Sequence, residues 1–354
     1  WRKESKTAIK AKDDLMKVMS FDDALNESLD PNKRHLLLGN GFSIACRPDI
    51  FLYGKLFEQA DFSRFSPSAK RAFDALKTQD FERVIKTLRD ASKVLKAYEN
   101  PSKELIEALK TDADGLRELL VETIAASHPE WPGELTEGEF SACNKFLSNF
   151  KTVYTLNYDL LLYWVQMHAE QGAGLNSDDG FRKPEDDPYA SYVTWEPENS
   201  YGQNTWFLHG ALHLFDAEIE IQKYTWSNTG IRLIEQIRDA LKKDYFPIFV
   251  SEGTSNEKWA RIRHNDYLAK AYRSFSGIGN DLFIYGHSLA ENDEHFLKCI
   301  EKGKLKNLYV GIYGDPSTDA NKKIISRANR LNTPKRKYSL NVKFFDSATA
   351  KVWG

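Results

Sequence analysis

Short apolar runs that end abruptly in glycine or polar residues recur along this chain, and they constrain its fold more than any other feature. Each run has the length and composition of a buried strand. Between the runs lie longer stretches with apolar residues at three- and four-residue spacing, which is typical of amphipathic helices. Strands that alternate with helices predict a mostly parallel sheet covered by helices. Four such runs are residues 35–38, 152–156, 206–208 and 282–285.

The same pattern predicts how the chain is divided. Residues 1–34 are polar and helix-prone, with an N-cap at Ser20, and are expected to form an N-terminal helical approach segment. Residues 35–354 are expected to form one α/β domain with a Rossmann-like, doubly wound parallel sheet, to which apolar runs at 247–250, 308–312 and 342–345 add strands.

Two segments of this domain depart from the alternation. Residues of about 55–150 have helical periodicity throughout and predict a large all-helical insertion. Residues of about 171–203 are rich in Gly, Asp, Pro and Asn, which predicts a long surface loop.

Composition narrows the class of partner. A formal net charge of −2 and a pI of about 6.5 provide no positive field for DNA or RNA, so nucleic acid is not the expected partner. Cys46, Cys143 and Cys299 form no CxxC pair, so we expect no disulfide framework and no structural zinc. No apolar stretch approaches about 18 residues, which predicts no membrane segment. A reducing cytoplasm is the expected location.

The end of the first run is a candidate phosphate site. It reads Gly39-Asn40-Gly41-Phe42-Ser43. Glycines let the backbone approach a pyrophosphate, amides at the start of the next helix point at the anion, and Ser43 adds a hydroxyl. The third glycine of the usual dinucleotide fingerprint is missing, and an ordinary tight turn explains the G-x-G pair equally well.

Asn157 and Asp159 follow the second run and are two residues apart, which places both side chains on the same side of an extended backbone. An amide can orient a water or a sugar hydroxyl, and a carboxylate can hold that group or stabilise positive charge. The alternative is that one of them caps the following helix.

His209 follows the third run and precedes Gly210. An imidazole there can act as a base or bond a ribose hydroxyl, although a lone histidine in such a run is more often structural. His213 lies four residues later, but no acidic or cysteine ligand is near in sequence, so we assign no metal.

The fourth run ends in Gly286-His287-Ser288, which offers another close backbone approach and a hydroxyl. Asp293 follows a few residues later. It either contacts the ligand or caps the helix that begins there.

In this order, the four segments resemble the glycine-rich, (Q)NxD, HG and GxSL elements of the sirtuin superfamily. The strings LLLGNGFSIA, TLNYDLLLYW, FLHGALH and IYGHSLAENDEHFL look more closely like the sirtuin-like NAD hydrolases of bacterial antiphage defence and a related bacterial family of unknown function. The resemblance covers the framework segments from Gly39 to about residue 300 and leaves out the helical insertion.

The resemblance implies roles residue by residue. Asn157 and His209 are implied to be the catalytic pair, and Asp159 is implied to support the nicotinamide-ribose end. The cofactor-binding residues that it implies around the phosphates are Gly39, Asn40, Gly41, Phe42 and Ser43. Those that it implies toward the adenosine side are Gly286, His287, Ser288 and Asp293. Asp49 weakly resembles the aspartate of the sirtuin loop that recognises nicotinamide.

The implied function is that of an NAD+ glycohydrolase (NADase), with NAD+ as substrate and no metal. Zinc-bearing deacylases of the superfamily carry four ribbon cysteines, which this chain lacks, so water is the simpler acceptor. An abortive-infection effector would need restraint, which predicts control by homo-oligomerisation or by a regulatory partner protein. The alternative is a non-catalytic sensor of NAD or ADP-ribose that acts through oligomerisation.

Overall fold

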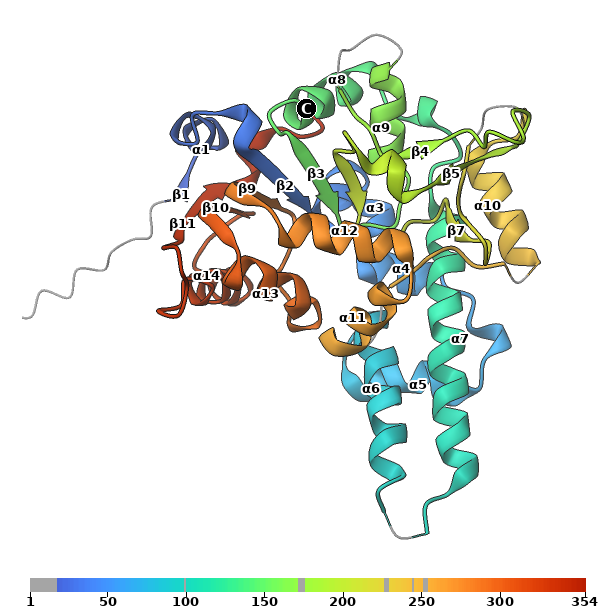
Figure 1. Cartoon of the computed structure of the whole chain (residues 1–354). Helices are drawn as coiled ribbons and strands as arrows, with labels where there is room; N and C mark the ends of the chain where they lie inside the picture. Colours follow the sequence, from blue (N-terminus) through green and yellow to red (C-terminus); the bar gives the residue numbers. More distant parts are fainter. Residues whose placement is uncertain (1–17, 99, 171–175, 226–228, 244, 251–253) are drawn as a thin grey trace, which may run out of the picture.

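A parallel β-sheet forms the centre of the molecule (Figure 1). The computed structural model describes residues 18–98, 100–170, 176–225, 229–243, 245–250 and 254–354. Within them a seven-stranded sheet has the order β1-β11-β10-β9-β2-β3-β6, and every pairing is parallel. The predicted Rossmann-like α/β fold is confirmed. The strands are β1 (Val18–Met19), β2 (Arg34–Leu38), β3 (Thr152–Thr155), β6 (Thr205–Phe207), β9 (Gly279–Tyr285), β10 (Lys304–Ile312) and β11 (Asn341–Asp346).

The sheet is wound in two directions from its centre. From β2 the chain proceeds to β3 and β6 on one side, whereas from β9, the other neighbour of β2, it proceeds to β10 and β11. Helices α8 (Glu137–Leu147) and α9 (Leu161–Glu170) lie on one face, and α12 (Asp266–Ser276), α13 (Glu294–Lys302) and α14 (Asp319–Arg330) lie on the other (Figure 1). The winding direction therefore reverses between β2 and β9, which is where open α/β sheets bind ligands.

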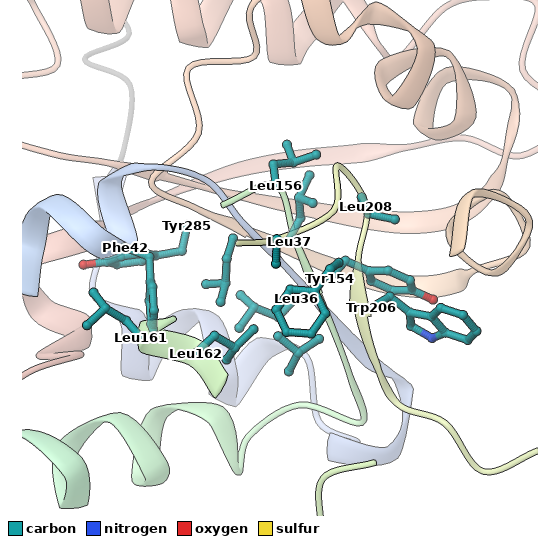
Figure 2. Packing of buried hydrophobic residues seen from close by; sticks show 14 of the residues in the cluster. Leu36, Leu37, Phe42, Tyr154, Leu156, Leu161, Leu162, Trp206, Leu208 and Tyr285 are labelled. Carbon is teal, nitrogen blue, oxygen red and sulfur yellow. The ribbon is translucent and has the colours of Figure 1, made fainter. Parts of the chain in front are cut away.

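The central strands are apolar on both faces because helices cover both. Leu36 and Leu37 of β2 are fully buried. They belong to one cluster with Tyr154 of β3, Leu156 just after β3, and Trp206 of β6 (Figure 2). Each fully buried leucine stabilises the fold by about 1.5–3 kcal/mol. The strand ends are consequently fixed points on which a site can be built.

Between β2 and β3 the described residues form helices and turns but no strand. These elements occupy the stretch in which the sequence predicts a helical insertion. They are α2 (Gly41–Cys46), α3 (Pro48–Phe51), α4 (Tyr53–Gln59), η2 (Phe62–Arg64), α5 (Pro67–Leu76), α6 (Phe81–Leu95), α7 (Lys103–Ser127), η3 (Pro132–Glu134) and α8.

Helices α6 and α7 form a long antiparallel pair that extends away from the sheet (Figure 1). Each begins at a side-chain cap: Asp80 accepts from the Arg83 amide, and Ser102 accepts from the Leu105 amide. At the base of the pair, aromatic rings of Phe62, Phe73 and Phe81 pack with centroids 5.0–6.2 Å apart. The insertion thus has a small aromatic core of its own.

A second, antiparallel sheet corrects the prediction of a long loop at about 171–203. Two of its strands and a 3-10 helix lie within that stretch, whose residues 171–175 are outside the described residues. The Gly, Asp and Pro residues supply the turns between short strands, so composition concealed them. Its strands are β4 (Phe181–Arg182), β5 (Tyr192–Trp195), β8 (Ile221–Tyr224) and β7 (Leu214–Asp216), in that order, with η4 (Pro197–Ser200) after β5.

The predicted strand at 247–250 is wrong. This segment lies between α10 (Leu233–Lys242) and α11 (Ser255–Arg263) and forms only an isolated bridge, from Phe249 to Gly210. Ile248 and Val250 are apolar because they are buried against the chain after β6, where the Val250 amide donates to the His209 carbonyl at 3.0 Å.

The N-terminal segment is built into the sheet from residue 18 onward. β1 pairs with β11 at the sheet edge, and α1 (Phe21–Glu27) follows. The predicted N-cap is confirmed, because Ser20 Oγ accepts from the Asp23 amide at 3.1 Å. Residues 1–17 lie outside the described residues. The remaining 3-10 helices are η1 (Pro31–Lys33), η5 (Glu291–Asp293) and η6 (Ser347–Ala350).

Among the helices of the described residues, none combines the length and the apolar character that crossing a bilayer requires.

Candidate active site

A cavity of about 760 Å³ lies at the carboxyl ends of the parallel strands. Residues that follow β2, β3, β6 and β9 all line it, so the four predicted segments meet at the point where the winding reverses. Helices of the insertion and the chain after β10 and β11 complete its walls. The predicted site residues in its lining are Gly39, Asn40, Gly41, Asn157, Asp159, His209, Gly286, His287, Ser288 and Asp293.

The two glycine loops pack against each other. A Cβ atom on Gly41 would lie 2.5 Å from Gly286 Cα, and one on Gly39 would lie 2.7 Å from the Gly286 carbonyl oxygen. The Gly41 amide donates to that carbonyl at 2.8 Å, and Gly286 has a φ of 70°. Glycine is therefore needed for contact between the loops. The Gly41 amide, which the sequence assigns to a phosphate, therefore already donates its hydrogen bond within the protein.

Other amides of these loops remain available. Among the described residues, no acceptor receives the backbone amides of Asn40, His287 and Ser288. All three residues line the cavity. Successive free amides beside glycine form a concave site that suits an anionic oxygen. The loop amides that are free to meet an anion are therefore those of Asn40, His287 and Ser288, and not that of Gly41.

Ser43 lies behind the cavity wall rather than in it. Its side chain is fully buried; Ser43 Oγ donates to Asp159 Oδ2 at 2.5 Å and accepts from Asn157 Nδ2 at 2.8 Å. The predicted direct contact between Ser43 and the cofactor is therefore not supported by its position. The hydroxyl instead links the segments after β2 and β3, which a sequence cannot reveal because these residues are more than a hundred positions apart.

Asp159 combines the two roles that the sequence leaves open. Its Oδ1 accepts from the Leu161 amide at 2.9 Å at the start of α9, and it also lines the cavity. Burial raises the pKa of Asp159 above its ordinary value, while the hydrogen bonds from Ser43 and Leu161 oppose that rise. Its position suits support of neighbouring groups more than direct proton transfer.

Asn157 leaves a buried acceptor without a partner. Its Nδ2 is held by Ser43, whereas no described residue donates to its Oδ1. A buried polar oxygen left unpaired costs about 1–3 kcal/mol, so such an atom in a cavity wall is expected to meet a water or a ligand hydroxyl. The hydrogen bond of Nδ2 to Ser43 thus orients the Asn157 side chain, while its Oδ1 is free to accept a hydrogen bond.

His209 is placed by the glycine after it. Gly210 has a φ of 83°, and a Cβ there would lie 1.9 Å from the Ile248 carbonyl oxygen, so only glycine permits this turn. The imidazole is 2% exposed, and its Nε2 lies 3.7 Å from Asp293 Oδ1. Burial, reinforced by the Lys258 charge, holds the pKa of His209 well below its ordinary value. The ring is therefore neutral at pH 7 and able to accept a proton.

Asp293 lies close to two histidines, His287 and His209, in addition to lining the cavity. It accepts from His287 Nε2 at 3.0 Å and from the Lys258 ammonium at 3.2 Å, and its side chain does not cap α13. Burial alone would raise the pKa of Asp293, but Lys258 and His287 outweigh burial and hold that pKa well below its ordinary value. The helix-cap alternative is wrong: the ionised carboxylate holds the His287 imidazole by a hydrogen bond and lies near the His209 imidazole without bonding it.

One ring nitrogen each of His209 and His295 and one Asp293 oxygen lie within 4.8 Å of one another, a spacing that a metal ion could bridge. The Lys258 ammonium, however, already pairs with the carboxylate of this set, and a second cation there would face its charge. We therefore interpret the three residues as an electrostatic cluster in which the Asp293 carboxylate lies near two neutral imidazoles.

Phe42 and Asp49 lie outside the cavity lining. The Phe42 ring is buried 4.9 Å from that of Trp353, whose indole Nε1 donates to the Phe42 carbonyl at 2.9 Å. Asp49 is exposed in the first turn of α3. The positions of both residues do not support the predicted cofactor contacts, because the Phe42 side chain is buried and that of Asp49 is exposed to solvent.

Sequence reasoning missed the charged wall of the site. Glu82 of α6 and Lys258 of α11 line the cavity, and their side chains are 3.4 Å apart. Lys258 is 1% exposed. In the sequence each is one polar residue within an amphipathic helix, and no local signal distinguishes it from a surface charge.

Comparison with known proteins identifies the family of the chain but not its activity. No curated protein matches it significantly. The family model described as a domain of unknown function (DUF4917) matches residues 36–353, which include most of β2, every later strand and all the predicted site residues in the cavity lining. The chain therefore belongs to the DUF4917 family.

Proposed function

We propose that this protein is an NAD+ glycohydrolase that cleaves the nicotinamide–ribose bond and releases nicotinamide and ADP-ribose. The cavity volume of about 760 Å³ is in the range of cofactor sites. Free loop amides suit the pyrophosphate, and a buried amide and a neutral histidine lie at the strand ends beside them. The resemblance to sirtuin-like NAD hydrolases favours the same substrate.

The open Oδ1 of Asn157 is the observation that carries the proposal. Its amide nitrogen is fixed by Ser43, so the acceptor oxygen is presented in one direction. A water that donates to Oδ1 has its lone pairs free to attack a sugar carbon. Because the bound water is already oriented, the reaction avoids the loss of entropy that orienting a water in solution would require in the transition state.

In the proposed reaction, the bond between ribose C1′ and the nicotinamide nitrogen breaks, and nicotinamide leaves with the electron pair. The ribosyl cation has oxocarbenium character, and the water on Asn157 adds to C1′. His209 accepts the proton that this water loses, and Asp293, 3.7 Å from Nε2, stabilises the imidazolium. The overall change consumes NAD+ and water and yields nicotinamide, ADP-ribose and a proton.

The biological role that we propose is an abortive-infection effector of antiphage defence in the bacterial cytoplasm. Depletion of NAD+ would stop growth of an infected cell, and such an activity must be restrained otherwise. Homo-oligomerisation or a regulatory partner protein would provide that restraint.

The proposal is tested by chromatography of NAD+ incubated with the purified protein over a series of protein concentrations. We expect release of nicotinamide and ADP-ribose by the wild type and none above background by Asn157→Ala or His209→Ala. The matched controls are Asn329→Ala and His264→Ala, which change exposed residues of the same types outside the cavity lining.

Two results would contradict the proposal. Turnover that survives Asn157→Ala would remove the amide from the mechanism. Binding of NAD+ without release of nicotinamide at any protein concentration would favour the sensor alternative.

A further inference from the structure

Glu82 brings the helical insertion into the candidate active site. It lies in the first turn of α6, two residues after the N-cap Asp80, and it lines the cavity. Its side chain is 15% exposed. Glu82 Oε2 accepts from Asn292 Nδ2 at 3.0 Å and lies 3.4 Å from the Lys258 ammonium. The carboxylate is therefore held by two groups outside the insertion.

The second oxygen of this carboxylate is open. No described residue donates a hydrogen bond to Glu82 Oε1, although Oε2 has two partners. An oriented carboxylate with one free oxygen in a cavity wall is a strong acceptor for a hydroxyl.

The contacts also place Glu82 at the end of the cavity where His209 lies. Lys258 bridges Glu82 to Asp293, and Asp293 lies 3.7 Å from His209 Nε2. A sugar held by Asn157 and His209 would therefore have Glu82 as a neighbour. Acidic side chains commonly bind ribose hydroxyls in dinucleotide sites.

We propose that Glu82 binds a hydroxyl of the nicotinamide-side ribose through Oε1, so that the helical insertion contributes a substrate-binding residue. This inference rests on the proposed function, because it assigns a contact to that substrate. Lys258 and Asn292 are positioning residues, which hold Oε2 and leave Oε1 without a partner among the described residues.

Burial agrees with a partly desolvated acceptor. It raises the pKa of Glu82 to about 7, a rise that Lys258 opposes and that Asp293 and Asp80 reinforce. A carboxylate that has lost hydration gains more from a ligand hydroxyl than one that is still solvated.

The test compares two ligands by calorimetry on the full chain. ADP-ribose carries the terminal ribose, whereas AMP carries only the adenine-side ribose. We expect the isosteric variant Glu82→Gln to weaken ADP-ribose binding about 10- to 100-fold and to leave AMP binding within about twofold, because only the former loses a charged hydrogen bond. Glu107→Gln, an exposed change in the same insertion, is the matched control and should alter neither.

The outcomes separate this inference from the proposed function. Wild-type release of nicotinamide tests the function, and only the difference between wild type and Glu82→Gln tests Glu82. Unchanged ADP-ribose affinity would overturn the inference even for an active enzyme. An equal loss of AMP and ADP-ribose affinity would also overturn it, because Glu82 would then act through general structure. Thermal melting of the variant distinguishes that case from unfolding.

Discussion

The parallel sheet and the helical insertion contribute different kinds of group to one cavity. At the strand ends, backbone amides and the oriented side chains of Asn157 and His209 are fixed by glycine turns and buried strands. The insertion contributes carboxylates, Asp80 and Glu82, from one end of a helix. Lys258 and Asp293 connect the two sets. The framework thus fixes the positions of the groups at the strand ends, whereas the insertion adds negative charge to the cavity wall.

The largest effect is expected where the two regions join. Lys258→Met should destabilise the protein by about 3–5 kcal/mol, because the carboxylates of Glu82 and Asp293 stay buried without a cation. Urea unfolding measures this loss. Lys93→Met is the control, since it removes an exposed ion pair with Glu257 that also joins α6 to α11, and it should cost less than about 1 kcal/mol. Equal losses would mean that the buried pair does not join the regions.

Substitutions in the framework and in the insertion should change different kinetic constants. Asn157→Ala is expected to lower kcat about 10²- to 10³-fold, the usual loss for one positioning group in a preorganised site. Glu82→Gln should instead raise KM and change kcat little, because we assign it to ribose binding. Steady-state kinetics of nicotinamide release measure both. A loss of kcat of equal size in both variants would contradict the assignment of Glu82 to ribose binding alone.

Glycines of the two regions should respond differently to a methyl group. Gly210→Ala should cost about 3 kcal/mol, since it adds left-handed strain and a Cβ against the Ile248 carbonyl. Gly115→Ala in α7 would place a Cβ 2.5 Å from Phe65 Cε1, but that ring is only partly buried and can shift, and alanine gains helix propensity. The stability of the protein should therefore change by less than about 1 kcal/mol. Thermal unfolding compares them, and similar losses would show that the insertion is equally rigid.

The smallest effect is a pH dependence that belongs to the insertion. Because the pKa of Glu82 is about 7, its ionised form increases as pH rises from 6 to 8, and ADP-ribose should bind up to about tenfold more tightly over that range. The charged groups around it are Lys258, Asp293 and Asp80. His209 stays neutral throughout, since its pKa is far below this range.

Glu82→Gln provides the control for this measurement, because His287 and every other titratable group near Asp293 are the same in both proteins. Calorimetry of the variant should show a flat pH profile between 6 and 8. A variant that kept the wild-type slope would assign the titration to another group.

Much of the framework could be predicted from the sequence. The apolar runs that became β2, β3, β6 and β9 are local signals, and glycine or polar residues mark where each ends. The parallel sheet and the meeting of these ends follow from such signals. Where local composition and structure disagree, as for β4 and β5, short strands were concealed by the turn residues around them.

The candidate site could be predicted only in part. Asn157, His209 and Asp159 lie in the cavity, whereas Ser43 and Phe42 lie beneath it. In the sequence all five stand at strand ends and cannot be separated, because the depth of a side chain depends on what packs over it. Asp49 is not in the lining, since the direction of α3 is a tertiary property.

The sequence by itself determined the alternation of strands and helices, the glycine turns and the polar residues at the strand ends, because periodicity and backbone freedom act over a few residues. Only the tertiary structure decided that Glu82 and Lys258, which are 176 positions apart, share a buried cavity wall. It also left Asn157 Oδ1 without a partner. Burial, charge pairing and unpaired atoms depend on distant segments that pack together, and no local pattern encodes them.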